Sequence, residues 1–178
     1  MMVGFTETLL SWHDFYFMVG GAAAGLAGLM FVAMSLGIHL VAQVTPENMK
    51  TFTTPSILYF MSVLLTACVM LIPPQTPLLL ALALFLGGLL GFAMSFRHVM
   101  NLIRTAKENQ DFTKGDWLAQ VVLPALSYTL LLTAAACFAA AQWGVGFGSV
   151  WFAAIFLLIA AVTNTWSLVT WIMDQGKP

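Results

Sequence analysis

Six polar side chains stand within or at the ends of long apolar stretches, where they could bind a ligand or line a passage. They are two histidines, two tyrosines and two asparagines: His39, His98, Tyr59, Tyr128, Asn101 and Asn164. An imidazole can ligate a metal or a haem iron, and its second ring nitrogen then needs an acceptor such as a tyrosine or asparagine side chain. The same groups could instead hydrogen bond a small solute or ion. Which chemistry is available depends on the helices that bring them together.

The two histidines are the strongest hint of a cofactor. His39 and His98 should lie at similar depth on parallel helices, a geometry that could supply two axial ligands to a haem iron. A pair of hydrogen-bonded histidines near the membrane surface, with no ligand, is the interpretation we favour. Cys68 and Cys137 are isolated and form no C-x-x-C pair, so they indicate neither zinc nor redox chemistry. We therefore expect no cofactor and no metal site.

The composition places these residues in a lipid bilayer. Of the 178 residues, 61% are hydrophobic and 7% are charged, with 6 Lys and Arg against 7 Asp and Glu. A soluble domain carries about a quarter of charged residues, so the chain is predicted to be an integral membrane protein. The scarcity of charge also argues against nucleic-acid binding. We find no paired carboxylates, no matched Ser/His/Asp set and no phosphate-binding glycine loop, and we predict that the protein is not an enzyme.

The gaps between charged residues predict the membrane spans. Residues 15–46, 51–96 and 117–173 contain no Asp, Glu, Lys or Arg. One helical crossing takes about 20 apolar residues, so the first stretch predicts one span and the others predict two each. Turns are expected at the breaker-rich segments 73–77 and 142–148. The expected fold is a single all-α transmembrane domain, residues 1–178, with five helices at about 15–43, 53–72, 78–104, 118–141 and 149–172.

The basic residues predict the orientation of the chain. All six fall on one side of a five-span arrangement: Lys50, Arg97, Arg104, Lys107, Lys114 and Lys177. Basic residues accumulate on the cytoplasmic side, so we expect the N-terminus outside and the C-terminus inside. The six polar side chains named above then lie in the cytoplasmic half, where they must find partners or water. The sequence therefore predicts a polar cavity that faces the cytoplasm.

The chain also contains two matched helical hairpins. Residues 28–35 and 88–95 agree at five of eight positions at an offset of 60, and a histidine follows each segment. A second match, at an offset of 69, pairs Pro55 with Pro124 and Tyr59 with Tyr128. Each proline either lies in the first turn of its helix or frees the carbonyl one turn back, near these tyrosines. Coincidence between two stretches rich in Leu, Ala and Gly is the alternative. We favour a duplicated two-helix hairpin followed by a fifth helix.

Small residues form one face of the first and third predicted spans. The glycines concerned are Gly21, Gly25, Gly28, Gly88 and Gly91. Small side chains let helices approach closely in lipid, which offers no hydrophobic drive for their association. Packing within the chain is one interpretation and a homo-oligomeric contact is the other, and both can hold.

The N-terminal span carries a family resemblance. Its Trp12-His13-Asp14-Phe15-Tyr16 segment and the glycine- and alanine-rich run over residues 20–35 resemble the start of a group of small, uncharacterised bacterial integral membrane proteins. Some members of that group carry the automatic label of modulators of a membrane-bound protease. The resemblance implies a multi-pass protein of the bacterial inner (plasma) membrane, and it supplies no catalytic or binding residue.

Three functions are compatible with these observations. The leading hypothesis is an oligomeric channel or facilitator for a small solute or ion, lined by the six polar residues. The second is an accessory or regulatory subunit that docks other membrane proteins through its glycine faces. The third is a b-type haem carrier that uses His39 and His98. The expected partners are the lipid bilayer, further copies of the chain and, in the second hypothesis, other membrane proteins.

Overall fold

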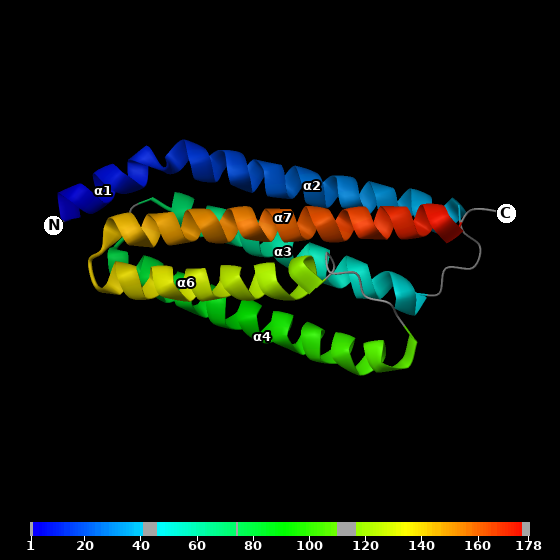
Figure 1. The fold of residues 1–178 in the computed structure, drawn as a ribbon. Coiled ribbons are helices and arrows are strands. Elements are labelled where there is room, and N and C mark those ends of the chain that lie inside the picture. The colour runs from blue at the N-terminus through cyan, green and yellow to red at the C-terminus, as the bar shows by residue number, and fades with distance from the viewer. Residues whose placement is uncertain (1, 41–45, 74, 110–116, 176–178) are drawn as a thin grey trace.

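The computed structural model is a bundle of long helices. It describes the backbone of residues 2–40, 46–73, 75–109 and 117–175, and the side chains of residues 4–36, 54–73, 75–101 and 117–170. The described residues contain no strand. The elements are α1 (Met2–Ser11), α2 (His13–Leu40), α3 (Pro46–Leu71), α4 (Pro77–Asn109), the π-helical turn η1 (Leu118–Val122), α6 (Leu123–Ala139) and α7 (Trp143–Gln175), as Figure 1 shows.

Five of these helical segments are long and apolar enough to cross a bilayer, which confirms the predicted number. They cover His13–Leu36, Thr54–Leu71, Pro77–Asn101, Leu118–Ala139 and Trp143–Thr170. Local chemistry fixes several of the ends. α3 and α4 both begin at a proline, whose fixed φ suits the first helical position. The Thr76 hydroxyl caps α4 by accepting a hydrogen bond from the backbone N–H of Leu79 at 3.3 Å.

The predicted turn over residues 142–148 is wrong, because α7 already begins at Trp143. The chain reverses between Ala140 and Gln142 instead. The N–H of Gln142 donates to the Cys137 carbonyl at 2.8 Å, and Ala141 adopts a left-handed φ of 59°. This is a Schellman ending of a helix with alanine in the position that usually holds glycine. The glycines that suggested a turn belong to the first turns of α7, where Gly146 lies against the ring of Phe138.

The N-terminal residues form an additional helix that the sequence did not predict. α1 ends at Ser11, and α2 begins at His13 in a new direction (Figure 1). Phe5 is 1% exposed, and its ring lies 5.1 to 6.3 Å from those of Phe138, Trp143 and Phe147. α1 is therefore docked by an aromatic cluster, which we call the aromatic cap, over the turn between α6 and α7.

The helices are arranged so that α7 lies between two hairpins. α2 packs against α3, and α6 packs against α4, while α7 contacts both α3 and α6. α3 and α4 meet more sparsely. Figure 1 places α2 and α4 on opposite sides of the bundle. It also shows α1 and the turn between α6 and α7 at one end of the bundle, the α1 end, and the start of α3 at the other, the C-terminal end.

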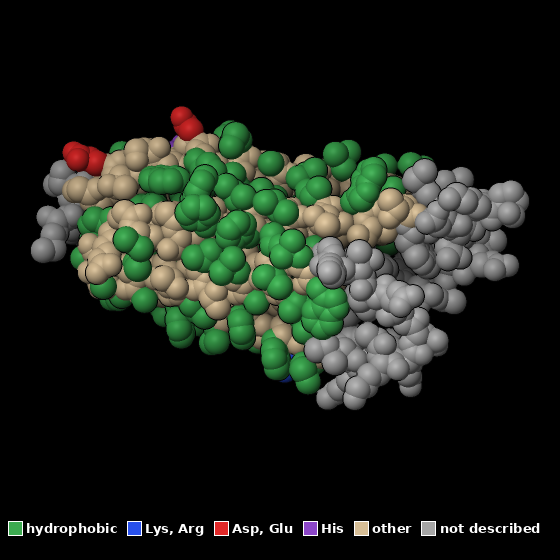
Figure 2. Space-filling view, in the orientation of Figure 1, with side chains coloured by type: hydrophobic (Ala, Val, Ile, Leu, Met, Phe, Trp, Pro, Cys, Tyr) green, Lys and Arg blue, Asp and Glu red, His purple; other side chains and the backbone are tan. Residues whose placement is uncertain are grey.

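The surface agrees with a protein that spans a membrane. Large apolar side chains are exposed all along the bundle, among them Leu29 at 67%, Leu78 at 73% and Trp166 at 68%. Figure 2 shows such side chains spread over the described face, with acidic side chains at the α1 end. Monomeric soluble proteins rarely expose apolar patches of this extent. The protein is therefore a multi-pass membrane protein whose helices present an apolar surface to lipid.

Candidate functional site

The half of the bundle toward the C-terminal end buries a group of neutral polar side chains. We call it the polar cluster: Tyr59 and Ser62 of α3, Ser95 and His98 of α4, Gln120 of η1 and Tyr128 of α6. Both tyrosines are fully buried, and Ser95 is 4% exposed. The cluster joins three separate helical segments across the centre of the bundle. Buried polar groups need partners in a bilayer, so the way these groups satisfy one another determines what remains for a ligand.

The π-helical turn η1 and Pro124 together expose a backbone acceptor. A proline has no N–H, so the carbonyl of Gln120, one turn before Pro124, lacks its usual helical donor. The Tyr59 hydroxyl donates to this carbonyl across a long distance of 3.4 Å and also interacts with the side chain of Ser95. This contact joins Tyr59 of α3 to a backbone acceptor before α6, while Pro124 itself lies in the first turn of α6. Single π turns inside α-helices often mark functional sites.

The side chain of Gln120 is the least satisfied polar group of the cluster. It is 0% exposed, and neither its oxygen nor its nitrogen has a hydrogen-bond partner among the described residues. The ring of His98 is close enough to interact with the carboxamide, yet its Nε2 also completes no hydrogen bond in that part of the chain. A buried polar atom without a partner destabilises the folded state by about 1–3 kcal/mol. A group that hydrogen bonded to these three atoms would offset this loss.

The pair formed by Tyr128 and Ser62 closes the cluster toward the middle of the bundle. The two hydroxyls lie 2.9 Å apart, and Ser62 also donates to the Leu58 carbonyl at 2.8 Å. The ring of Tyr128 lies directly on Gly91 of α4. A Cβ atom at position 91 would lie 2.1 Å from ring atom Cε1, so only glycine allows this approach. Gly91 thereby positions Tyr128 against α3.

The six residues predicted to line a cavity do not all lie together. Tyr59, Tyr128 and His98 belong to the polar cluster, whereas Asn101 is exposed on α4. Asn164 is 1% exposed in α7, and its Nδ2 atom has no hydrogen-bond partner among the described residues. The backbone of His39 belongs to α2, and its side chain lies outside the described residues.

The helix arrangement bears on the haem hypothesis. α2 carries His39 and α4 carries His98, and these two helices lie on opposite sides of the bundle (Figure 1). Two histidines at the same depth on parallel helices need not be neighbours. Within the described side chains, no three His, Cys, Asp or Glu residues come together as a metal site would require. The arrangement therefore offers no support for a haem held between the two histidines.

The five glycines predicted to pack helices divide into two sets. Gly88 and Gly91 pack against α6, where a Cβ at position 88 would meet Leu132 at 3.1 Å. Gly21, Gly25 and Gly28 are exposed on α2, and a Cβ at any of them would meet nothing within 4 Å. Packing within the chain thus explains the glycines of α4 and leaves those of α2 facing outward.

Ser62, Ser95 and Gln120 are the members of the cluster that were not among the six residues predicted from the sequence. The burial of Gln120 depends on the π turn. This turn adds a residue to the helix and so changes the direction in which the preceding side chains point. The signal that could have found Gln120 is its place four residues before Pro124, the carbonyl position that a proline leaves without a donor.

The polar cluster supplies hydrogen bonds from hydroxyls, a carboxamide, an imidazole and a carbonyl. Its members include no carboxylate, ammonium, guanidinium or thiol, so the chemistry it offers is the recognition of neutral polar groups. No protein-family model matches the sequence, and no curated protein or solved structure is significantly similar to it.

Proposed function

We propose that this protein is a non-enzymatic facilitator that binds a small neutral solute at the polar cluster and lets it cross the membrane. The observation that carries the proposal is the side chain of Gln120, which is fully buried and whose two polar atoms complete no hydrogen bond of good geometry among the described residues, although the ring of His98 lies close to it. A carboxamide offers a donor and an acceptor side by side, and the adjacent His98 Nε2 adds a third position. A solute of the size of urea or glycerol could satisfy all three.

In the proposed orientation this site faces the cytoplasm. Lys50 lies near the start of α3, and Arg97, Arg104 and Lys107 lie in the second half of α4, on the side where α2 and α4 end, which the positive-inside rule assigns to the cytoplasm. The N-terminus is then outside and the C-terminus inside. The membrane is the bacterial inner (plasma) membrane, as the resemblance of the N-terminal span implies.

A duplicated hairpin explains why two similar tyrosines meet in one cluster. Tyr59 and Tyr128 follow matched prolines, both are fully buried, and each lies on the second helix of its hairpin. α7 contacts that second helix in both hairpins. These features support an arrangement of two parallel repeats around a central fifth helix, with the polar cluster formed where the repeats meet.

The aromatic cap is the closed end of the proposed path. Phe5, Phe138, Trp143 and Phe147 fill the bundle at the α1 end with rings. A solute that reached the cluster from the cytoplasm would have to pass this cap to leave on the outer side. Because α1 is a short, separate helix, its displacement is the simplest movement that would loosen the cap.

Homo-oligomerisation is part of the proposal, and a second candidate function shares its basis. Gly21, Gly25 and Gly28 form a smooth outward face on α2, which suits close contact with another helix. In the facilitator that helix belongs to a second copy of the chain. In the alternative, an accessory subunit, it belongs to a larger membrane protein.

Proteoliposome flux tests the proposal. Vesicles with and without the purified protein are mixed with a hyperosmotic solution of urea, glycerol or potassium chloride, and swelling is followed by stopped-flow light scattering. We expect faster swelling with urea or glycerol and no change with the salt. Gln120→Leu, which keeps the approximate volume and removes both polar atoms, should lower the solute rate at least tenfold. Gln142→Leu, at an exposed turn position, is the matched control and should retain the rate.

Equal swelling of vesicles with and without protein would refute the facilitator, as would a Gln120→Leu rate equal to that of the unaltered protein. Copurification from native membranes separates the two candidates in that event. An accessory subunit would elute as a minor component of a larger complex, whereas a facilitator elutes as a self-assembled oligomer.

A further inference from the structure

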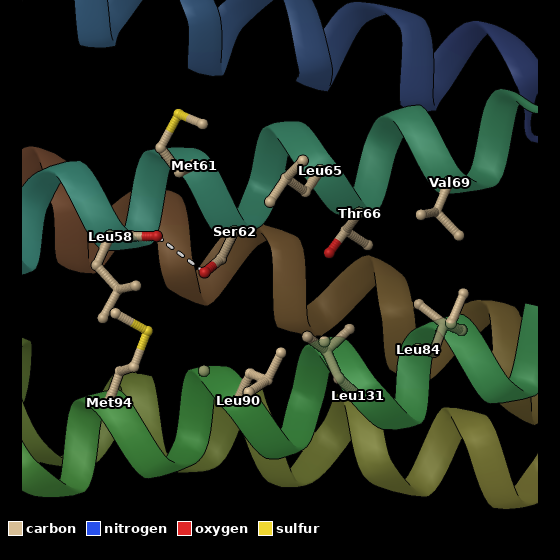
Figure 3. Close-up of a pocket in the computed structure, with 13 residues that line it drawn as sticks. Leu58, Met61, Ser62, Leu65, Thr66, Val69, Leu84, Leu90, Met94 and Leu131 are labelled. Carbon is tan, nitrogen blue, oxygen red and sulfur yellow. Dashed lines mark hydrogen bonds between the residues drawn. The ribbon is translucent and has the colours of Figure 1, made fainter.

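A groove between α3 and α4 lies beside the polar cluster, which contributes Ser62 to its lining. It has a volume of about 240 Å³, and residues of α3 from Leu58 to Val69 form one of its walls. Figure 3 shows Met61, Leu65 and Val69 on the α3 side and Leu84, Leu90 and Met94 on the α4 side. The groove exists because α3 and α4 approach each other only sparsely. From this groove we propose a specific lipid site.

The size of the groove suits a single hydrocarbon chain. Eleven residues of helix separate Leu58 from Val69, which at about 1.5 Å per residue makes the groove about 16 Å long. An α-helix with its side chains is about 10 Å wide and could not enter a space of 240 Å³. Small-molecule pockets usually begin at about 300 Å³, so a bulky ring system is also disfavoured. A long, narrow space within the membrane is best filled by an acyl chain.

The lining has the chemistry of a chain site. It consists mainly of leucine, methionine, valine and small residues, with Gly87 leaving the α4 wall open. Ser62 lies at the groove, but its hydroxyl is engaged by the Leu58 carbonyl and by Tyr128 (Figure 3). That hydroxyl therefore has little polarity to offer the groove.

The charge at one end of the groove identifies the headgroup. Gly87, Leu90 and Met94 line the groove at spacings of three and four, and the next position in this helical series is Arg97. Arg97 is exposed, and it has no ion-pair partner among the described residues. A guanidinium on the same helix face as an acyl-chain groove would bind an anionic headgroup. We propose that the groove and Arg97 bind an anionic phospholipid, with one acyl chain in the groove and the phosphate at Arg97.

Native mass spectrometry of the full-length protein in detergent tests this site. The probes are phosphatidylglycerol and phosphatidylcholine with identical chains, each titrated separately. We expect the protein to retain phosphatidylglycerol at about fivefold lower concentration, the gain that one basic residue provides at an anionic headgroup. Arg97→Gln should abolish this preference and leave the binding of phosphatidylcholine unchanged.

A second variant tests the groove. Gly87→Leu fills it, because a Cβ at position 87 meets nothing within 4 Å, and should weaken the binding of both lipids about tenfold. Ala93→Leu adds a similar side chain to α4 at an exposed position outside the groove and should bind both lipids normally. If Gly87→Leu fails to fold, Gly87→Ala should show a smaller loss in the same direction.

Three results would overturn the lipid site. They are equal retention of the two lipids by the unaltered protein, normal lipid binding by a folded Gly87 variant, and a change of oligomeric mass in Gly87→Leu. The last result would assign the groove to a second copy of the chain. None of these measurements depends on solute flux, so the lipid site and the proposed function fail or stand separately.

Discussion

The contact between Gly91 and Tyr128 makes a sharp prediction about stability. Replacing Gly91 with alanine adds one carbon atom at 2.1 Å from Cε1, 2.6 Å from Cδ1 and 2.7 Å from Cζ of the tyrosine ring. All three distances are well inside van der Waals contact. The ring cannot move away freely, because Tyr128 is fully buried and its hydroxyl lies 2.9 Å from that of Ser62.

The expected loss has two parts. Overpacking of a well-packed site destabilises by about 1–3 kcal/mol. Displacement of the ring also breaks the bond to Ser62, and a hydrogen bond between membrane helices contributes about 0.6 kcal/mol on average. The higher helix propensity of alanine offsets up to about 1 kcal/mol of this. Gly91→Ala should therefore lower the free energy of unfolding by about 2 kcal/mol, or the melting temperature by about 4–8 °C.

Thermal unfolding in detergent, followed by tryptophan fluorescence, measures this change. Gly87→Ala is the matched control, one turn away on the same helix with nothing within 4 Å of its Cβ, and should leave stability unchanged or slightly higher. Tyr128→Ala should make Gly91→Ala harmless, because the ring that clashes is gone. Equal melting temperatures for the two alanine variants would refute the assignment of Gly91 as the residue that positions Tyr128.

Three further substitutions test the fold. Ala141→Gly should stabilise the protein by about 1 kcal/mol, because a left-handed φ strains an L side chain, and a higher melting temperature would show it. Tyr59→Phe should lower stability by about 0.6 kcal/mol through the lost bond to the Gln120 carbonyl; an unchanged unfolding midpoint would contradict that bond. Phe5→Ala should remove about 3 kcal/mol of packing from the aromatic cap and detach α1, which hydrogen exchange of residues 4–11 would detect as lost protection.

The number of spans follows from the sequence because the bilayer imposes it. A helix must stay apolar for about 20 residues to cross, so charges and prolines delimit the spans with little help from tertiary structure. Glycines are less informative, because a glycine can either mark a turn or make room for a neighbouring side chain within a helix. The glycines over residues 144–148 suggested a turn, yet at Gly146 the missing side chain makes room for Phe138. Only the packing of α6 against α7 distinguishes these uses.

The sequence predicts where along the bundle the polar cluster lies, but it does not predict which residues belong to it. Positions along the spans placed Tyr59, Tyr128 and His98 in the same half of the bundle, and they do meet there. The sequence does not determine the rotation of each helix about its axis, and this rotation decides which side chains face the core. The π turn changes this rotation at Gln120, so that the Gln120 side chain faces the core. Asn101 remains at the surface. α1 was missed because a helix of ten residues is too short for the signal that reveals a span.

The two matched hairpins use equivalent glycines differently, and this difference bears on assembly. Gly88 packs against α6, whereas Gly28, its counterpart at an offset of 60, faces outward from α2. α2 meets α3 through another face, where a Cβ on Gly20 would lie 2.9 Å from that of Ala67. If the hairpins share an origin, the glycine face of α2 has kept the shape for close packing, although no helix among the described residues packs against it. A helix from outside the chain would restore the contact that α6 makes with α4, which is why we place the proposed oligomeric contact on α2.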